Sequence, residues 1–389
     1  MNRIPLAYFI IFGLLAWGLP AVLVAGPGAA VLALAVSLPV WLLNRKVKTV
    51  ARDLRAFTAP VCATLFGASL LYLAYDILFG RNLLSYNLLL FGHEAFERSV
   101  DYDNAHFGLG RGFSEMLGFV MGFLPFFLAD RLRGAPKAWL WALWVVVALL
   151  VFNETGSGRQ YLLVAIAAFA AGRSSSLRRM VWTGCVLLAS FAFVSFARGD
   201  FDHSDLGNPL FDGMAFPYIN LALMLNTECG TGTWYGYAGE FFKKFLPAFI
   251  FPKSIFSFNV EMSLCIYPFM GNAVNSVSIF TYLGEFYYYR PPIVTALLAG
   301  VLIGLLTRLV DRWLVEANLM ATRIFTGIMC VGMLRSRTQD LLSFLLSLAI
   351  FLLLVRPLLA GSNRAVRAGK SEQTGSGFGT AVSAPQPAP

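Results

Sequence analysis

Long apolar runs alternate with short polar turns over most of this 389-residue chain. A helix needs about 20 mostly apolar residues to cross a bilayer, and it satisfies its own backbone hydrogen bonds there. About ten runs approach that length, and the sixth of them is short. We therefore predict membrane-spanning helices at 4–24, 27–43, 56–79, 113–130, 137–153, 160–172, 180–197, 291–308, 317–335 and 339–358.

The charged residues in the turns assign a side of the membrane to each end of these helices. One set of alternate turns, with the two ends of the chain, carries about 19 basic and 5 acidic residues, or about +14. The opposite set carries about 11 basic and 16 acidic residues, or about −5. Cytoplasmic turns are the basic ones, so we expect both termini in the cytoplasm. The first run has no small-residue cleavage site and is expected to stay as an anchor.

Composition supports a multi-pass membrane protein. The chain is 58% apolar and 13% charged, and its mean hydropathy is +0.67. Soluble domains carry about 25% charged residues, so a soluble enzyme and a nucleic-acid-binding protein are both excluded. The net charge of +9 follows from the basic cytoplasmic turns. We predict an all-α polytopic membrane protein with about ten transmembrane helices.

The chain divides into one transmembrane domain, 1–360, and a Gly/Ser/Ala/Pro-rich tail, 361–389, expected to be disordered in the cytoplasm. Two outer loops, 80–112 and 198–290, belong to the domain. The second lies between spans seven and eight and is too long to lack internal structure. Its apolar stretches FPYINLALMLN and FFKKFLPAFIF are typical of helices lying in the interface plane, which either cap the bundle or hold a lipid substrate.

The same loop contains Cys229 and Cys265. If this face is oxidising they pair, and otherwise they are two unpaired thiols. The other three cysteines fall inside predicted spans, where cysteine serves as a small apolar packing residue.

Few residues suit metal or proton-coupled chemistry. No CxxC or HExxH pattern occurs, and the three histidines fall in predicted outer loops. The interiors of the predicted spans contain almost no carboxylates, which argues against an ion-coupled transporter.

Arginine is the more informative residue type on the outer face. Its planar fork binds phosphate oxygens in pairs and does not lose its charge. Single arginines at span ends often extend to the interface, but four occupy span mouths here. The outer arginines are Arg81, Arg98, Arg111, Arg159, Arg198, Arg290, Arg335 and Arg337.

Two stretches place polar groups beside predicted spans. In GSGRQ, the amides of Ser157 and Gly158 precede Arg159, so the turn either approaches a phosphate or only joins two helices. In SIFTYLGEFYYYRPP, the aromatic residues either belong to the interfacial belt or stack on sugars. Glu285 is the carboxylate within this second stretch.

Three motifs together resemble the Wzy-type family of oligosaccharide repeat-unit polymerases, which extend O-antigens and exopolysaccharides. They are GSGRQYLL at 156–163, SIFTYLGEFYYYRPPIVTALLAGVLIGLL at 278–306 and MLRSRTQDLL at 333–342. The layout of spans and the large outer loop are also similar to that family. Two departures occur. Tyr288-Tyr289-Arg290 stands where the family often has Asn-Phe-Gly, and Arg335-Ser336 stands where it often has Arg-Gly.

The resemblance implies a bacterial inner-membrane glycosyltransferase of GT-C-like architecture. Donor and acceptor are oligosaccharides on undecaprenyl diphosphate, embedded among membrane lipids. The acceptor's sugar hydroxyl attacks the donor's anomeric carbon, and undecaprenyl diphosphate leaves. The resemblance implies no nucleotide sugar, no metal and no cofactor, no nucleic acid, and a separate chain-length-determining co-polymerase as partner.

Within that reaction the residues take roles by their chemistry. Fixed arginines stabilise the leaving diphosphate, with Arg159 and Arg335 the first candidates and Arg198 and Arg290 the next. Ser157 and Gly158 join them in binding the substrate. Glu285 is the first candidate for the base that takes the acceptor's proton. The other candidates for the base are Glu154, Asp200 and His203. The aromatic residues that would line a sugar groove are Tyr282, Tyr287, Tyr288 and Trp234.

Three other functions stay open. An O-antigen ligase has a similar fold and donor, and His203 is the loop histidine that such an enzyme would use. A lipid-linked oligosaccharide flippase is disfavoured by the bare span interiors and the large loop. The third open function is that of a structural or assembly protein of the membrane. A transferase using a monosaccharide-phosphate lipid is disfavoured because the first outer turn, 25–28, has no acidic residue.

Overall fold

The structure is a computed structural model, and it describes residues 5–45, 209–227, 229–245, 258, 262, 265–266, 280–316 and 319–353. The third to seventh predicted spans, the outer loop 80–112 and the tail 361–389 lie outside the described residues. The predictions made for them stay predictions.

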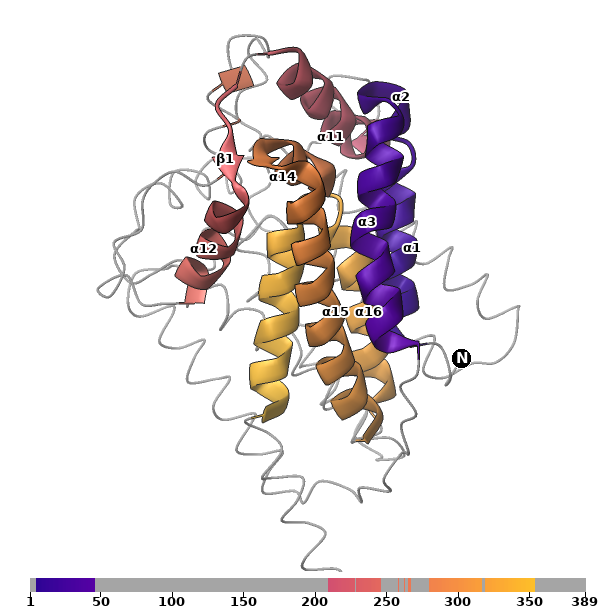
Figure 1. The fold of residues 1–389 in the computed structure, drawn as a ribbon. Coiled ribbons are helices and arrows are strands. Elements are labelled where there is room, and N and C mark those ends of the chain that lie inside the picture. The colour runs from indigo at the N-terminus through magenta and orange to yellow at the C-terminus, as the bar shows by residue number, and fades with distance from the viewer. Residues whose placement is uncertain are drawn as a thin grey trace, which may run out of the picture.

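The described part of the chain is mostly helical (Figure 1). Two strands of two residues each pair in parallel, with Gly232 opposite Tyr289 and Thr233 opposite Arg290. The elements are α1 (Leu6–Gly18), α2 (Val22–Ala25), α3 (Pro27–Asn44), α11 (Pro209–Asn226), β1 (Gly232–Thr233), α12 (Trp234–Phe245), α14 (Tyr282–Tyr288), β2 (Tyr289–Arg290), α15 (Pro292–Glu316) and α16 (Met320–Met333). A further helix, Thr338–Leu353, is named helix 338–353.

One helix among the described residues, α15, is long and apolar enough to cross a membrane. It has 25 residues. Helices α1, α3, α16 and 338–353 are also apolar, but each is shorter over its described length. The described elements therefore agree with an all-α chain that contains one helix of membrane-spanning length.

Two predicted boundaries are wrong. The run 4–24 is divided, because α1 ends at Gly18 and α2 begins again at Val22 after the proline at position 20. Proline has no N–H to continue the helical ladder. The run 291–308 ends too early, since α15 continues to Glu316. Hydropathy falls where the charged residues begin, but a helix can continue beyond its apolar section.

The apolar helices pack side by side, with α1 beside α3 and α16, and α3 beside α15 (Figure 1). The α3–α15 contact depends on two small residues one turn apart. A Cβ on Gly300 would lie 2.5 Å from the carbonyl oxygen of Val36, and one on Gly304 would lie 3.2 Å from the Cα of Val40. Small residues at this spacing let two helix backbones approach closely. Asn44 adds an interhelical hydrogen bond, donating from Nδ2 to the Gly304 carbonyl at 3.1 Å.

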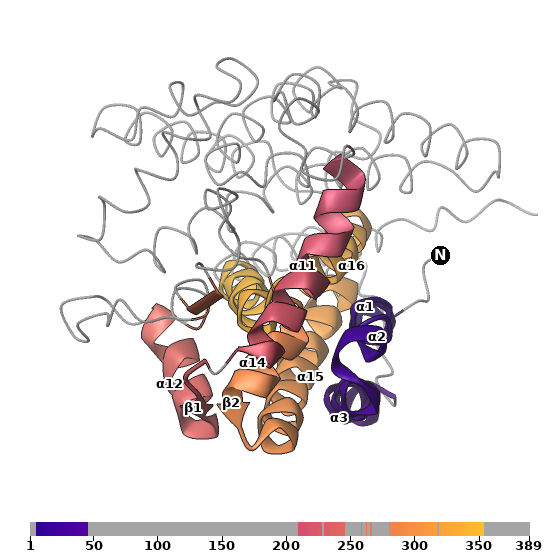
Figure 2. The ribbon, with the colours of Figure 1, turned by 90° about the horizontal axis from the view of Figure 1, so that it is seen from above.

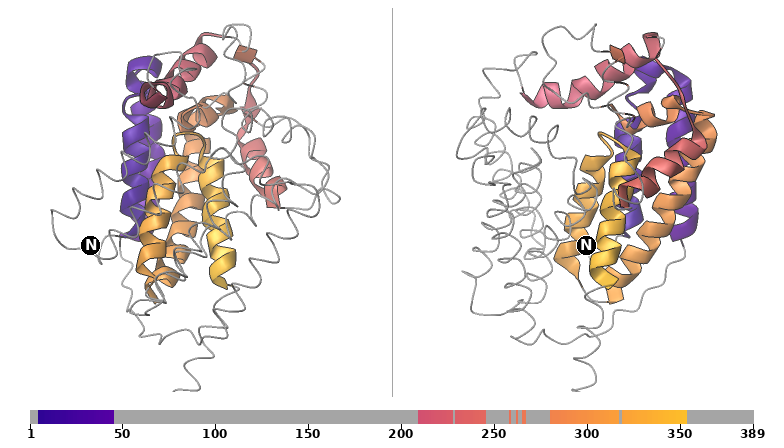
Figure 3. Two further views of the ribbon diagram at one scale, coloured as in Figure 1. Left: turned by 180° about the vertical axis from the view of Figure 1, so that it is seen from behind. Right: turned by 90° about the vertical axis from the view of Figure 1, so that its left-hand side faces the viewer.

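The large loop contains helices among its described residues, as expected for a loop of that length. Helix α11 contains the stretch FPYINLALMLN and runs across one end of the bundle (Figure 2 and Figure 3). The Tyr218 hydroxyl donates to the Trp17 carbonyl at 3.1 Å, and the two rings stack with centroids 6.5 Å apart. Helix α12 overlaps the start of the second stretch, FFKKFLPAFIF. Both helices therefore lie where the loop meets the bundle.

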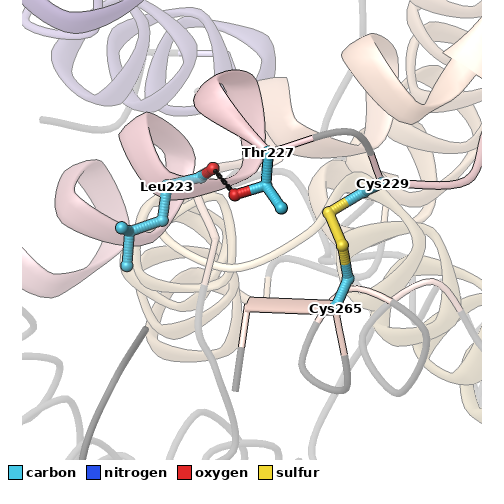
Figure 4. Close-up of a disulfide and its surroundings, with 4 residues drawn as sticks. All are labelled: Leu223, Thr227, Cys229 and Cys265. Atoms are coloured by element: carbon cyan, nitrogen blue, oxygen red, sulfur yellow. Dashed lines mark hydrogen bonds between the residues drawn. A yellow bond between two sulfur atoms is a disulfide. The ribbon is translucent and has the colours of Figure 1, made fainter. Parts of the chain in front are cut away.

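A disulfide closes part of this loop. Cys229 lies three residues after the end of α11 and is bonded to Cys265, with their Cα atoms 5.8 Å apart (Figure 4). Beside it, the Thr227 hydroxyl donates to the Leu223 carbonyl at 2.7 Å. The pairing that the sequence left open is present in the structure. Cys330 is free and buried in α16, in agreement with a packing role.

An ion pair is buried between α15 and α16. Arg323 binds Asp311 through two hydrogen bonds, Nε to Oδ1 at 2.7 Å and Nη2 to Oδ2 at 3.1 Å. The two side chains are 9% and 7% exposed. The predicted spans 291–308 and 317–335 leave Asp311 in the turn between them, whereas the structure places it within α15 and Arg323 within α16.

Candidate functional site

The short helix α14 lies at the same end of the bundle as α2 and α11 (Figure 1). The Tyr282 hydroxyl attaches it to α1, donating to the Leu14 carbonyl at 2.7 Å. This contact needs a glycine on α1, since a Cβ on Gly18 would overlap the same hydroxyl. After α14, strand β2 pairs with β1, and the Arg290–Pro291 peptide bond is cis. The stretch containing Glu285 is thus attached to α1 on one side and to the α12 segment on the other.

Glu285 is completely buried in α14 and reaches the beginning of helix 338–353. Its Oε2 accepts the backbone N–H of Thr338 at 2.7 Å and also the Thr338 hydroxyl. The first N–H groups of a helix have no partner within the helix, and they favour a negative charge. The second and third motifs of the sequence therefore meet at one carboxylate, although the two residues are 53 positions apart.

Burial controls the ionisation of this carboxylate. Removal from water raises the pKa of Glu285 from 4.5 to about 7, and the nearby Asp340 also raises it. The Thr338 hydrogen bonds and the positive charge of Arg337 act in the opposite direction, but they are the weaker influence. A carboxyl with a pKa near neutrality exchanges its proton easily at physiological pH, which suits a general base.

Arg337 is part of the same turn. It binds Asp340 in a bidentate pair, with Nε to Oδ2 at 2.9 Å and Nη2 to Oδ1 at 2.8 Å. Their side chains are 16% and 25% exposed, so the pair lies at the edge of the buried region. The positive charge of Arg337 acts on Glu285 from this position.

Tyr237 of α12 completes the group from a third part of the chain. Its hydroxyl lies 2.7 Å from the Thr338 Oγ1. Its backbone carbonyl accepts a hydrogen bond from the side-chain Nε2 of Gln339 at 3.3 Å. Tyr237 is fully buried, and its ring meets that of Tyr289 edge-on at 5.5 Å. Burial raises the pKa of Tyr237 well above its ordinary value, so its hydroxyl keeps its proton.

Besides Glu285 and Trp234, the structure describes five of the site residues predicted from sequence. Arg335 is half-buried in the turn between α16 and helix 338–353, and Arg290 is exposed at the end of β2. Tyr288 is almost buried, against Phe258 and Tyr289. The five residues are Arg290, Arg335, Tyr282, Tyr287 and Tyr288.

Two of the predicted sugar-binding tyrosines have different surroundings. Tyr282 has no exposed surface, and its hydroxyl is bonded to α1, so its position suits packing. Tyr287 is half-buried, and its hydroxyl has no hydrogen-bond partner among the described residues. Trp234, at the start of α12, is 44% exposed. Tyr287 and Trp234 are therefore the better placed of these aromatic candidates.

The remaining predicted site residues lie outside the described part of the chain. For these the structure neither supports nor opposes a role. They are Ser157, Gly158, Arg159 and Arg198, together with the alternative bases Glu154, Asp200 and His203.

Two residues of this group, Thr338 and Tyr237, were not predicted from the sequence. Thr338 lies within the stretch MLRSRTQDLL, in which the sequence indicated the two outer arginines, with a role for Arg335 and none for Arg337. Tyr237 lies in an amphipathic helix between two exposed aromatic residues, and no spacing rule distinguishes it from them. Neither residue could be found from spacing, because only the fold brings Thr338 to Glu285 and Tyr237 to Thr338.

No group of three or more His, Cys, Asp or Glu side chains in the described ranges is placed to hold a metal ion. Comparisons with protein family models, with curated proteins and with solved structures found no match. The resemblance to the polymerase family therefore rests on the three sequence motifs and the predicted layout of the spans.

Proposed function

We propose that the chain is a multi-pass protein of the bacterial inner membrane, with about ten spans and both termini in the cytoplasm. Large apolar side chains point outward from α3 and α15, which suits contact with lipid. These exposed residues are Val31, Leu34, Leu38, Trp41 and Leu42 of α3 and Leu297, Val301, Leu305 and Leu309 of α15. The Cys229–Cys265 disulfide suits a loop in the oxidising periplasm.

We further propose that the protein is a Wzy-type polymerase that joins oligosaccharide repeat units on undecaprenyl diphosphate at the periplasmic face. The observation that carries this proposal is the position of Glu285. It is a buried carboxyl with a pKa of about 7, and it lies where two of the three family-like motifs meet. A structural carboxylate in an ordinary ion pair would instead have its pKa lowered.

The reaction assigns a task to each group. The acceptor's sugar hydroxyl forms the new C–O bond at the donor's anomeric carbon while Glu285 takes its proton. The bond from that carbon to the diphosphate oxygen breaks, and the electron pair leaves with undecaprenyl diphosphate. Arginines stabilise the charge that develops on the leaving group. Arg335 is the candidate in the described part of the site, and Arg159, Arg198 and Arg290 are the further candidates.

The experiment that tests this proposal uses the purified full-length protein in liposomes. The substrate is the lipid-diphosphate repeat unit from the source cells, added without nucleotide sugar or an energy source. A ladder of multiples on a gel is the expected result. With intact substrate and no ladder, addition of a lipid A core acceptor tests for a ligase. Transfer of the substrate across the bilayer without any new bond identifies a flippase. Either of these outcomes overturns the polymerase proposal.

Variants connect the activity to the site. Glu285→Gln removes the base and is expected to lower the rate by 10²–10⁴-fold. Arg159→Ala is expected to abolish polymer while the protein stays in the membrane. The matched control is Glu316→Gln, which removes a carboxylate from the opposite end of α15. Wild-type activity in Glu285→Gln would show that Glu285 is not the base.

A further inference from the structure

Three buried groups from separate parts of the chain form a continuous series of hydrogen bonds. The Tyr237 hydroxyl contacts the Thr338 Oγ1 at 2.7 Å, and the Thr338 hydroxyl donates to the Oε2 of Glu285. Thr338 has one hydroxyl proton, and the charged carboxylate takes it. Tyr237 must therefore be the donor to Thr338 whenever Glu285 is ionised.

The two oxygens of the Glu285 carboxylate are not equivalent. Oε2 accepts two hydrogen bonds, both from Thr338. Oε1 is buried and has no hydrogen-bond partner within the described ranges. A buried acceptor without a partner is costly, and such atoms in native proteins often belong to functional groups. Oε1 is therefore the carboxylate oxygen with unused capacity to accept a hydrogen bond.

We propose that Tyr237 is a positioning residue for Glu285, acting through Thr338, so that Oε2 is held in place and Oε1 receives the proton of the acceptor hydroxyl. This inference rests on the proposed role of Glu285 as a base. Tyr237 is fully buried on α12, and its hydroxyl is engaged with Thr338. Because Tyr237 belongs to α12, the orientation of the Glu285 carboxyl depends on how α12 packs.

The charged and titratable groups around this series come from each element packed against it. Arg337 and Asp340 belong to the turn before helix 338–353 and its first residues, and both act on Glu285. Glu240 of α12 acts on Tyr237, and Tyr289 of β2 packs on the Tyr237 ring. Substitutions at Tyr237 and Thr338 leave all four in place, so a change in the titration of Glu285 reports the hydroxyl series.

The first measurement is an infrared titration of the protonated carboxyl band in the full-length protein in detergent. Glu285→Gln identifies the band by its loss. Thr338→Val removes a hydrogen bond to the charged form of Glu285, so the titration midpoint of Glu285 is expected to rise by about one pH unit in this variant. Tyr237→Phe keeps the ring and removes the donor to Thr338, and is expected to raise the midpoint by about half a unit. Thr338→Ser keeps the hydroxyl and should restore the wild-type midpoint.

The second measurement is the polymer ladder as a function of pH and substrate concentration. Tyr237→Phe should lower kcat about tenfold without a change in KM, and the rising limb of the pH profile should move to higher pH. The control is Tyr235→Phe, the same substitution on the same helix at a residue that is 65% exposed. It should match the wild type in both measurements.

The outcomes separate this inference from the proposed function. If Tyr237→Phe and Thr338→Val both titrate and react as Tyr235→Phe does, while Glu285→Gln is inactive, the positioning role is wrong and the base is retained. If Glu285→Gln keeps full activity, the proposed base is wrong, whatever the titrations show. A fall in kcat with no shift in either pH midpoint would also overturn the inference, because it indicates a packing defect.

Discussion

The pH dependence of stability gives the most direct test of the Glu285 environment. The pKa of this carboxyl is about 7 in the folded protein, against 4.5 for an exposed glutamate. Between these values the folded protein holds a proton that the unfolded chain has released. The contribution of Glu285 to the free energy of unfolding therefore falls as the pH rises from about 4.5 to about 7, and this contribution is constant on either side. The difference of about 2.5 pH units corresponds to roughly 3 kcal/mol.

In the Glu285→Gln variant, the glutamine has no titratable proton at this position. Other carboxylates and the histidines titrate equally in both proteins, so the difference between wild type and variant isolates Glu285. We expect the thermal midpoint of the wild type in detergent to fall relative to the variant by a few degrees between pH 4.5 and pH 8. Glu316→Gln, at the far end of α15 and bonded to Arg312, should instead run parallel to the wild type.

Two results would refute the reasoning. Parallel curves for wild type and Glu285→Gln would mean that the carboxyl titrates as if exposed. A wild type that gains stability relative to the variant as the pH rises would mean that the charged form is favoured. In the second case the Thr338 hydrogen bonds and the field of Arg337 would outweigh the cost of burial, instead of being outweighed by it.

Three further predictions concern the frame around the site. Gly300→Ala places a Cβ 2.5 Å from a backbone carbonyl of α3 and should lower the free energy of unfolding by about 1–3 kcal/mol. Gly239→Ala on α12, where an added Cβ has no atom within 4 Å, should be close to neutral. Equal thermal midpoints for the two variants would contradict this. Arg323→Ala leaves a buried carboxylate unpaired and should cost about 3–5 kcal/mol in stability. Arg312→Ala, whose side chain is 65% exposed, should change stability by less than about 1 kcal/mol, and similar losses in both would argue against burial of the first pair. Cys229→Ser should add one maleimide-reactive thiol in the denatured, unreduced protein by freeing Cys265, and a loss of one thiol would argue against the disulfide.

Helix positions were predicted well where polar residues bound an apolar run closely. The prediction 27–43 matches α3, Pro27–Asn44, because a Gly-Pro turn precedes the run and basic residues follow it. The end of α15 was missed, because hydropathy measures suitability for lipid and not the persistence of a helix. Its last turns, with Arg312 and Glu316 bonded at a spacing of four residues, are an ordinary helix of mixed polarity.

The candidate site was predicted only as far as single residues allow. Glu285 stood out because it is the carboxylate in an aromatic stretch. Its partner Thr338 is 53 positions away, and Tyr237 is 101 positions from Thr338. No periodicity connects such distances, and only the packing of α12, α14 and helix 338–353 brings these residues together. The sequence also did not decide whether Cys229 and Cys265 pair, since pairing depends on how the loop folds back.

The Asp311–Arg323 pair also affects how the chain assembles. Its members are twelve positions apart, one on each helix of the α15–α16 hairpin. They can therefore find one another without help from any other segment. In a chain that enters a membrane piece by piece, a lone buried charge would oppose insertion of either helix. With the pair formed, the charges of Asp311 and Arg323 offset each other, and under the proposed membrane location the two helices are expected to insert together as one unit.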